Sequence, residues 1–197
     1  MTLKNFIKQY DKTDAVILLE GKRTVLKEDQ DKLEQLGYLL ASKTTKMTFR
    51  SGNASGADLY FSKGISKIDP SRLQVVMPYK GHRTKQQQTP NAIALEMVDL
   101  TQEPELVKQS KANKQMEKLV ERYVSGIRDR LTIKAAYIIR DTLKAIGTTH
   151  IKPTTFGIFY DDLQHPKQGG TGHTMIVCEN NNIPIINQDI WFSWIED

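Results

Sequence analysis

The sequence predicts an α/β fold in which helices cover a mostly parallel sheet. Short β-prone runs occur at 15–19, 46–50 and 73–77, and the first is a continuous aliphatic and β-branched stretch. Such a stretch is typical of a strand that is buried on both faces. Segments with apolar residues at helical spacing separate the runs. The order strand, helix, strand therefore implies right-handed parallel crossovers.

The first half of the chain alternates these two patterns. Residues 1–13 are polar and mixed, which predicts a short helix or a loosely held end. Leucines recur at helical spacing between 27 and 43 and predict a helix there. A second helix is expected after the loop of small residues that follows the second strand. Pro78 ends the third strand.

The second half contains a long section without strand-like runs. We expect a helical piece at 92–98 and a mostly helical stretch from 105 to 146, with a break near Gly126. No linker-like composition flanks this section. We therefore expect it to be a helical insertion, at about 84–147, within one domain that spans 1–197.

The chain ends on a further strand, helix and strand, predicted at 156–160, 171–181 and 183–186. The tail at 190–195 is rich in large apolar side chains, and we expect it to dock on its own subunit. A homodimer contact through this tail is the alternative.

Two loops of small residues share one design. The first lies at 50–58 and contains Gly52 and Gly56, and the second lies at 168–174. Each follows a β-prone run and precedes a helix. In parallel α/β proteins such turns lie at the carboxyl edge of the sheet, where backbone N–H groups and a helix N-terminus can hold an anion. Together they predict two sides of one crevice, with a phosphate as the simplest guest.

Basic residues follow the first strand directly. Lys22 and Arg23 come after Glu20 and Gly21, so they are expected to project toward the same edge as the two loops. The alternative is that both are solvated turn residues.

The charge balance favours anionic partners. Lysine and arginine number 28 against 23 acids, which gives a net charge of +5. The basic residues are interleaved with acids, so a nucleic-acid partner is possible but not favoured. The lone cysteine, Cys178, excludes an intramolecular disulfide and is read as a small buried apolar residue. The sequence shows no signal peptide and no apolar run of spanning length, which predicts a cytoplasmic protein without a membrane partner.

Candidate metal and acid–base groups are few. The four histidines lack zinc-site spacing. Asp161 and Asp162, at a strand end, are candidates to hold Mg²⁺ beside a phosphate, with solvated loop acids as the alternative. Arg140 and Asp141, on an apolar helix, form an internal salt bridge or reach the crevice.

Several motifs in chain order resemble one superfamily. They are Gly21-x-Arg23, Arg50-Ser51-Gly52-x-x-x-Gly56-Ala57-Asp58, and Gly169-Gly170-Thr171-Gly172-His173-Thr174 followed by Ile183-Pro184-Ile185-Ile186-Asn187. The set resembles the SLOG superfamily. That group unites the Rossmann-like core of the DNA-processing protein DprA, the LOG cytokinin-activating phosphoribohydrolases, molybdenum-cofactor carrier-like proteins and small phage or bacterial proteins of unknown role. This chain is most similar to the small phage-type members.

The resemblance implies a Rossmann-like three-layer sandwich that holds a nucleotide-type ligand between the two loops, with phosphate near the second. Asp58 would cap free N–H groups or contact a ribose hydroxyl. The expected ligand-binding residues are Gly21, Lys22, Arg23, Arg50, Ser51, Gly52, Asn53, Gly56, Asp58, Gly169, Gly170, Thr171, Gly172, His173 and Thr174.

The second loop departs from the hydrolytic LOG pattern, Pro-Gly-Gly-x-Gly-Thr-x-Glu-Glu. Gln168 replaces the proline, His173 takes the threonine place, and Met175 and Ile176 stand where the two glutamates would be. Glu179 lies a helical turn further on. Without those carboxylates the hydrolytic chemistry loses its rationale, so ligand binding without turnover is the favoured hypothesis.

Three function classes follow. The first is binding of a nucleotide or nucleotide-derived small molecule in a sensing, sequestering or carrier role. The second is hydrolysis of a nucleotide N-glycosidic bond, for which no catalytic residue is assigned, although His173 could act as an acid or base. The third is single-stranded DNA binding of the DprA type, which the basic charge balance motivates.

Overall fold

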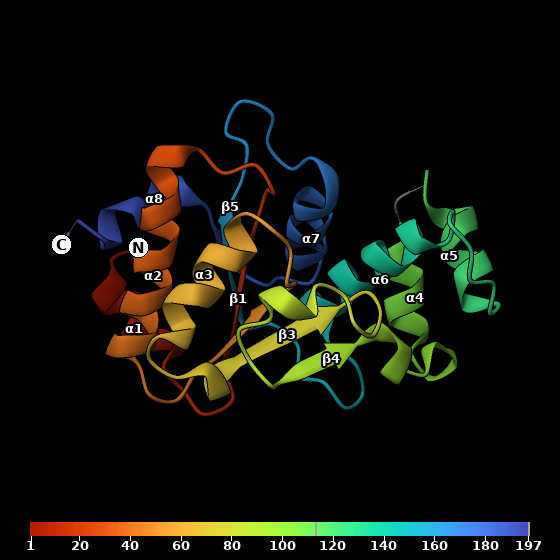
Figure 1. Cartoon of the computed structure of the whole chain (residues 1–197), viewed down its shortest axis with the longest axis horizontal. Helices are drawn as coiled ribbons and strands as arrows, with labels where there is room; N and C mark the ends of the chain where they lie inside the picture. The colour runs from red at the N-terminus through yellow and green to blue at the C-terminus, as the bar shows by residue number, and fades with distance from the viewer. Residues whose placement is uncertain (113, 197) are drawn as a thin grey trace.

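The computed structural model describes residues 1–112 and 114–196, and its centre is a six-stranded parallel sheet (Figure 1). The strand order is β4-β3-β2-β1-β5-β6, and every neighbouring pair is parallel. The strands are β1 (Val16–Gly21), β2 (Thr48–Ser51), β3 (Leu73–Met77), β4 (Ala92–Ala94), β5 (Phe156–Tyr160) and β6 (Ile185–Ile186). The predicted α/β fold with a parallel sheet is confirmed.

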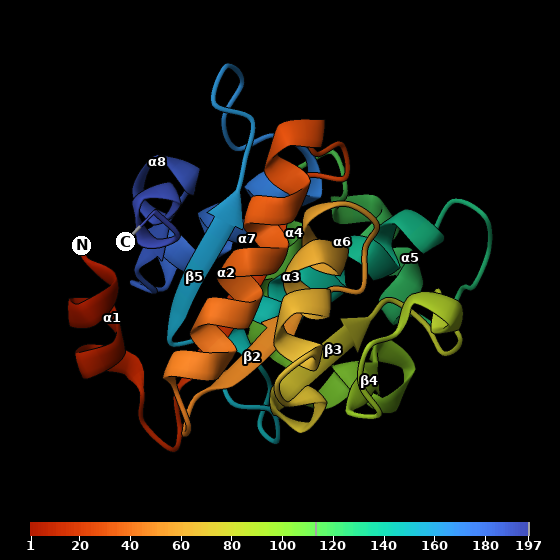
Figure 2. The same ribbon diagram turned by 60° about the vertical axis from the view of Figure 1, so that its left-hand side comes forward.

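Helices cover both faces of the sheet, which gives three layers (Figure 2). One face packs against α1 (Leu3–Tyr10), α2 (Gln30–Lys43), α3 (Ala57–Ser66) and α8 (Gln188–Trp191). The other face packs against α6 (Ile133–Ile146) and α7 (Gly169–Asn180). Outside α6 lie α4 (Pro104–Lys111) and α5 (Glu117–Val124).

The alternation of side chains along the central strand produces the two cores. Ile17 and Leu19 belong to the cluster with α2 and α3, whereas Leu18 belongs to the cluster with α7. Successive residues of a strand point to opposite faces, so a strand buried on both sides needs apolar residues throughout. The aliphatic run in β1 meets that need.

The prediction of a helix at 92–98 is wrong. Ala92–Ala94 forms the edge strand β4, paired with Val75–Met77 of β3, and only a short 3-10 helix, Leu95–Met97, follows. A segment this short has little helical preference of its own. Hydrogen bonding to the open edge of β3 therefore decides its conformation.

Both ends of the chain are held by the first core. The N-terminal segment forms helix α1, the first of the two alternatives for residues 1–13. Trp191 and Trp194 of the tail are fully buried, and the ring of Trp194 lies 5.0 Å from that of Phe6 between centroids. The predicted docking of the tail on its own subunit is confirmed.

Two further expectations concern burial and membranes. Cys178 is fully buried in the core beneath α7, as predicted. Within the described part of the chain, none of the helices combines the length and the apolar character needed to cross a bilayer.

Candidate ligand-binding cleft

A cleft of about 610 Å³ opens at the carboxyl edge of the sheet. After β1 the chain continues to β2 on one side, and it returns much later to β5 on the other side of β1. Ligands of open α/β sheets bind at such a topological switch point. The cleft is lined by the residues that follow β1, by part of the first small-residue loop, by α6 and by the start of α7.

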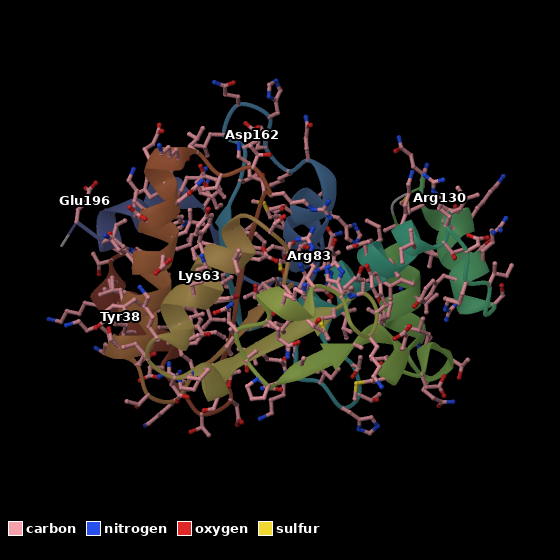
Figure 3. All side chains as sticks on the ribbon, viewed as in Figure 1. Tyr38, Lys63, Arg83, Arg130, Asp162 and Glu196 are labelled. Carbon is pink, nitrogen blue, oxygen red and sulfur yellow. The ribbon has the colours of Figure 1, made fainter. Side chains whose placement is uncertain are left out.

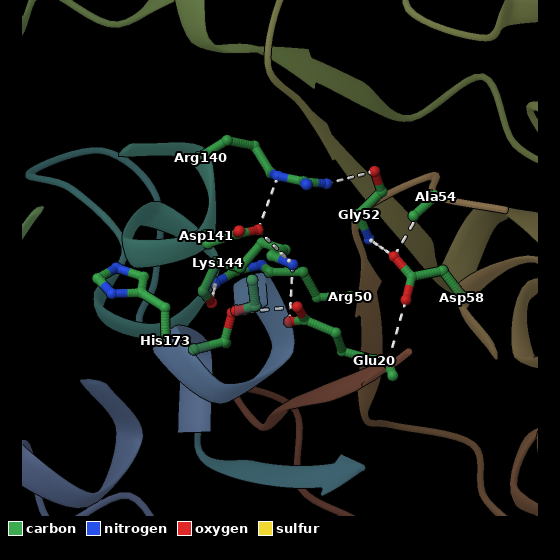
Figure 4. Close-up of polar contacts among 12 residues, drawn as sticks. Glu20, Arg50, Gly52, Ala54, Asp58, Arg140, Asp141, Lys144 and His173 are labelled. Atoms are coloured by element: carbon green, nitrogen blue, oxygen red, sulfur yellow. Dashed lines mark hydrogen bonds and ion pairs between the residues drawn. The ribbon is translucent and has the colours of Figure 1, made fainter. Parts of the chain in front are cut away.

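The first loop is closed by an internal carboxylate. Asp58, in the first turn of α3, is buried and accepts hydrogen bonds from three backbone N–H groups (Figure 4). Gly21 N lies 3.1 Å from Oδ1, while Gly52 N and Ala54 N lie 3.1 and 3.3 Å from Oδ2. Asp58 thus supplies the acceptor for these N–H groups, which is one of the two roles expected for it, and contact with a ribose hydroxyl stays a prediction. Because these three N–H groups are already bonded to Asp58, they are not available to a ligand.

The two glycines of this loop allow close packing against the protein. A Cβ at Gly52 would lie 2.3 Å from Nη1 of Arg140. Gly56 has a φ of +86°, and a Cβ there would lie 2.2 Å from the carbonyl oxygen of Arg23. Asn53 is buried in a left-handed conformation, and its Nδ2 donates to the carbonyl oxygen of His82 at 3.1 Å. Gly52, Asn53 and Gly56 do not line the cleft.

Arg50 holds the sheet to α6. It is fully buried, and its three guanidinium nitrogens donate to Oε1 of Gln74 and to the carbonyl oxygens of Lys144 and Lys152 at 2.7, 2.9 and 2.8 Å. Burial lowers the pKa of Arg50 to about 10, so the group stays charged at neutral pH. Ser51 is also fully buried, and neither residue lines the cleft.

A buried ionic network forms the floor of the cleft (Figure 4). Nζ of Lys144 lies 2.7 Å from Oε2 of Glu20 and 2.9 Å from Oδ1 of Asp141. The same Asp141 oxygen lies 2.9 Å from Nε of Arg140. Burial raises the pKa of Glu20 to about 8, opposed by the charge of Lys144 and assisted by Asp141 and Asp58. The internal salt bridge predicted for Arg140 and Asp141 is confirmed, and both residues also reach the cleft.

Arg140 supplies a fixed positive charge with one unused donor nitrogen. The residue is only 4% exposed, its Nη1 donates to the carbonyl oxygen of Gly52 at 2.6 Å, and its Nε faces Asp141. Across residues 1–112 and 114–196, Nη2 makes no hydrogen bond. Burial alone would lower the pKa of Arg140, but the surrounding carboxylates outweigh it and raise that pKa.

The second loop, unlike the first, is open. Helix α7 begins at Gly169, and the side chain of the N-cap residue Gln168 makes no capping bond. Gln168, Gly169 and Gly170 are exposed and line the cleft, together with Thr171. The N–H groups of Gly169, Gly170 and Thr171 have no acceptor among the residues that the structure describes. Free N–H groups at a helix N-terminus are suited to bind an anion.

The residues that follow in the second loop serve the interior. Thr174 is fully buried, and its hydroxyl donates to Oε1 of Glu20 at 3.1 Å. Gly172 packs against the backbone of Lys167. His173 does not line this cleft. Its Nε2 atom lies 2.8 Å from the hydroxyl oxygen of Thr142. Burial lowers the pKa of His173, with a further lowering from Lys144 and an opposing effect of Asp141.

The structure therefore divides the expected ligand-binding residues into two groups. Those that line the cleft are Gly21, Lys22, Arg23, Asp58, Gly169, Gly170 and Thr171. Those that do not are Arg50, Ser51, Gly52, Asn53, Gly56, Gly172, His173 and Thr174. Sequence reasoning missed Glu20, Lys134 and Tyr137, which line the cleft, and Lys144, which pairs with Glu20 and Asp141. The signals were present, since Glu20 is the last residue but one of an otherwise apolar strand, and Lys144 lies one helical turn after Arg140.

An aromatic and basic edge borders the cleft on the α6 side. The ring of Tyr137 lies 5.8 Å from Cζ of Arg23 and 5.6 Å from that of Arg140. The His82 ring lies 5.6 Å from Tyr137 between centroids. Burial, with the charge of Arg140 next, lowers the pKa of His82 to about 4, so it is neutral at pH 7. Rings and guanidinium groups of this kind stack on nucleobases.

The two acids after β5 both have partners within the protein. Asp161 is buried and accepts from the N–H of Lys167 at 2.8 Å, which is contrary to the solvated alternative for this residue. Asp162 lies on the loop that leaves β5 and pairs with Nζ of Lys22 at 3.4 Å (Figure 3). Throughout the described ranges, no group of three or more His, Cys, Asp or Glu side chains is arranged to hold a metal ion.

Comparison with known proteins gives one informative likeness. No protein-family model matches the chain, and no curated protein matches it. Among solved structures, it is similar to DNA processing protein A from Helicobacter pylori, described for its single-stranded DNA binding mode. The TM-score is 0.53 at 13% sequence identity, over 89% of this chain and 65% of that protein. The chain thus spans less than two thirds of that protein's length, and the likeness is one of fold.

Proposed function

We propose that residues 1–197 form one SLOG-type domain that binds a nucleotide or nucleotide-derived small molecule in the cleft between β1 and β5. The observation that carries this proposal is the pairing of two unused donor sets in one cleft. They are Nη2 of Arg140 and the free N–H groups at the start of α7. A phosphate has several acceptor oxygens and a negative charge. It can therefore accept hydrogen bonds from both donor sets and pair with the positive charge of Arg140.

The other walls suit the remainder of a nucleotide. Tyr137 and Arg23 offer an aromatic ring and a guanidinium group for a base. Lys134 is exposed in the first turn of α6 and lines the same cleft. A phosphate in this cleft would be close to the positive charges of Lys134 and Arg140. We infer a sensing, sequestering or carrier role.

Catalysis is less well supported than binding. Met175 is buried, and Ile176 faces outward, at the positions where the LOG pattern has glutamates. Glu179 pairs with Lys167 at 2.7 Å and does not line the cleft. The observation in favour of an N-glycosidic hydrolase is Glu20, a cleft residue whose pKa is raised to about 8 by burial, as for a general acid.

Single-stranded DNA binding is the second candidate function. It is favoured by the fold likeness to DNA processing protein A, which binds single-stranded DNA. The net charge of +5 and the stacking groups beside the cleft are compatible with it.

Mass spectrometry of ligands carried through purification tests the main proposal first. We expect a phosphorylated nucleoside derivative to leave the protein on denaturation. Calorimetry with the four ribonucleoside monophosphates then compares Lys134→Glu with the control Lys4→Glu. Both lysines are exposed and are the second residue of a helix, but Lys4 lies on α1, away from the cleft.

We expect Lys134→Glu to weaken nucleotide binding about tenfold, roughly 1.4 kcal/mol, and Lys4→Glu to leave it within twofold. Equal effects of the two variants would contradict a phosphate in this cleft. Release of free base from the monophosphates would favour the hydrolase instead. Tighter, salt-sensitive binding of an oligonucleotide in a mobility-shift titration at two salt concentrations would favour the DNA-binding candidate.

A further inference from the structure

A second cleft, of about 710 Å³, lies on the other side of the start of α7. It runs between α4 and α7, and Glu105, Gln109, His173, Ile176 and Val177 contribute to its walls. The amides of Gln109 and Asn181 exchange hydrogen bonds of 3.1 and 2.7 Å, which fixes α4 against α7. The second cleft is therefore bounded by two helices that are tied together.

The two clefts meet at the open turn. Met116, Ile138, Gly169 and Gly170 line both of them. Gly169 and Gly170 are also the residues whose N–H groups are free to receive a phosphate. A phosphate held there would have one cleft on each side. Each cleft is within the size range of protein sites for small organic ligands.

His173 gives the second cleft a buried polar group that has no partner on one side. The residue is 8% exposed, and its Nε2 lies 2.8 Å from the hydroxyl oxygen of Thr142. That hydroxyl donates to the carbonyl oxygen of Ile138 at 3.0 Å, and a carbonyl oxygen can only accept. Thr142 must therefore accept from Nε2–H.

The tautomer of His173 follows from that bond. The neutral ring carries its hydrogen on Nε2, so Nδ1 presents a lone pair. Of the residues that the structure describes, none is hydrogen-bonded to Nδ1. Figure 4 shows the ring on the side of Asp141 and Lys144 that faces away from Gly52. The second cleft thus offers an acceptor, which suits an exocyclic amine or a hydroxyl of a ligand.

The walls of this cleft combine apolar surface with polar side chains, among them Glu105, Gln109 and Lys167. Ile138, Ile176 and Val177 provide apolar surface, and Asn180 adds an amide at the rim. Amide side chains pair with the edges of bases. A base and its ribose combine these features with the donors that His173 requires.

From this geometry we propose that the protein binds a dinucleotide unit, in which a phosphate linkage sits at Gly169 and Gly170 and one nucleoside occupies each cleft. The inference rests on the proposed function and extends it to the class of ligand. A free dinucleotide and one step of a single-stranded nucleic acid share this chemistry. A mononucleotide would fill only one side.

Calorimetry tests this proposal with matched probes. The probes are the four ribonucleoside monophosphates, the corresponding 5′-phosphorylated homodinucleotides and twelve-residue single strands of the same bases. We expect at least one dinucleotide to bind ten times more tightly, or better, than its monophosphate. Ile176→Glu should remove that advantage, because the added carboxylate projects from an exposed position of the second cleft. Ile68→Glu, an exposed isoleucine outside both clefts, should keep it.

His173→Gln provides a second, chemically specific variant. The glutamine amide can replace the Nε2–H donor to Thr142, but it leaves no acceptor in the place of Nδ1. We expect a weaker dinucleotide complex with little change in the unfolding free energy. In the unligated protein, ¹⁵N chemical shifts of the ring should report hydrogen on Nε2 at neutral pH.

The outcomes separate the inference from the function on which it rests. Equal affinity for dinucleotide and monophosphate overturns the inference and leaves nucleotide binding in place. Failure of every probe to bind overturns both. If the dinucleotide advantage is present, a further gain with the twelve-residue strand identifies nucleic acid as the source, and no gain identifies a free dinucleotide.

Discussion

The two small-residue loops look alike in the sequence but differ in the structure. The loop after β2 already contains an anion, because the carboxylate of Asp58 accepts from the N–H groups of Gly21, Gly52 and Ala54. The loop before α7 has no acid in its own first turn, and its N–H groups are free. The difference shows that an acid at the start of the helix decides whether such a turn is closed or available to a ligand.

The open loop also has a carboxylate nearby, that of Asp141. Oδ2 of Asp141 comes within 2.9 Å of where a Cβ on Gly170 would lie. That carboxylate is already paired with Arg140 and Lys144, so its charge is largely balanced. The open turn therefore faces a neutralised carboxylate and the unused nitrogen of Arg140.

Removal of the internal anion should have the largest effect. Asp58→Ala leaves two buried N–H groups and one partly buried N–H group without an acceptor, and we expect a loss of about 3 kcal/mol or more in the free energy of unfolding. Urea denaturation measures it. Asp31→Ala is the control, since Asp31 is also the second residue of its helix but is exposed, and its loss should be below about 1 kcal/mol. Similar losses for both variants would mean that Asp58 acts only on the helix dipole.

The pH dependence of stability should reveal Glu20, which joins β1 to the helix of the open turn through Thr174. Burial raises its pKa from 4.5 to about 8, so the folded state holds the proton more tightly than the unfolded state. The contribution of Glu20 to the free energy of unfolding is fully present below pH 4.5 and is lost as pH rises through about 8.

The wild-type protein should therefore lose stability relative to Glu20→Gln between pH 6 and 7, by about 1.4 kcal/mol at most. Urea denaturation of both proteins at several pH values measures this difference. A difference that stays constant from pH 5 to 8 would show that Glu20 is ionised throughout.

A grafted acid should close the open turn. Gly169→Asp places a carboxylate at the start of α7, in imitation of Asp58, and we expect nucleotide binding to weaken about tenfold. Gly169→Asn controls for the backbone, because Gly169 has a φ of +63° and both side chains tolerate that conformation. No atom lies within 4 Å of a Cβ at this position, so neither variant clashes. Equal affinities of the Asp and Asn variants would argue against an anion at this turn.

Much of the fold could be predicted because its strands carry their own signal. The runs at 73–77 and 156–160 coincide with β3 and β5, since strands covered on both faces need mostly apolar residues, and Gln74 is the polar exception in β3. Ala92–Ala94 carries no such signal. Its strand conformation comes from pairing with β3, which is a tertiary contact that local sequence does not contain.

The site could be predicted only in outline. Glycines and a following helix indicate a turn at a sheet edge, and both loops do contribute to one cleft. The sequence does not show that Lys144 pairs with Glu20. Nor does it show that Arg50 donates its hydrogen bonds to the carbonyl oxygens of Lys144 and Lys152. Such partners lie far apart in the chain. Their pairing therefore depends on how the layers pack.

Amide chemical shifts measured during ligand titration test whether an anion binds at the start of α7 and not in the loop closed by Asp58. With ¹⁵N-labelled protein, inorganic pyrophosphate and the four ribonucleoside monophosphates should produce saturable shifts at Gly169, Gly170 and Thr171 that are larger than those at Gly52 and Ala54, whose N–H groups are bonded to Asp58. Shifts concentrated at Gly52 and Ala54, or none at the start of α7 with any of these probes, would contradict anion binding at the start of α7.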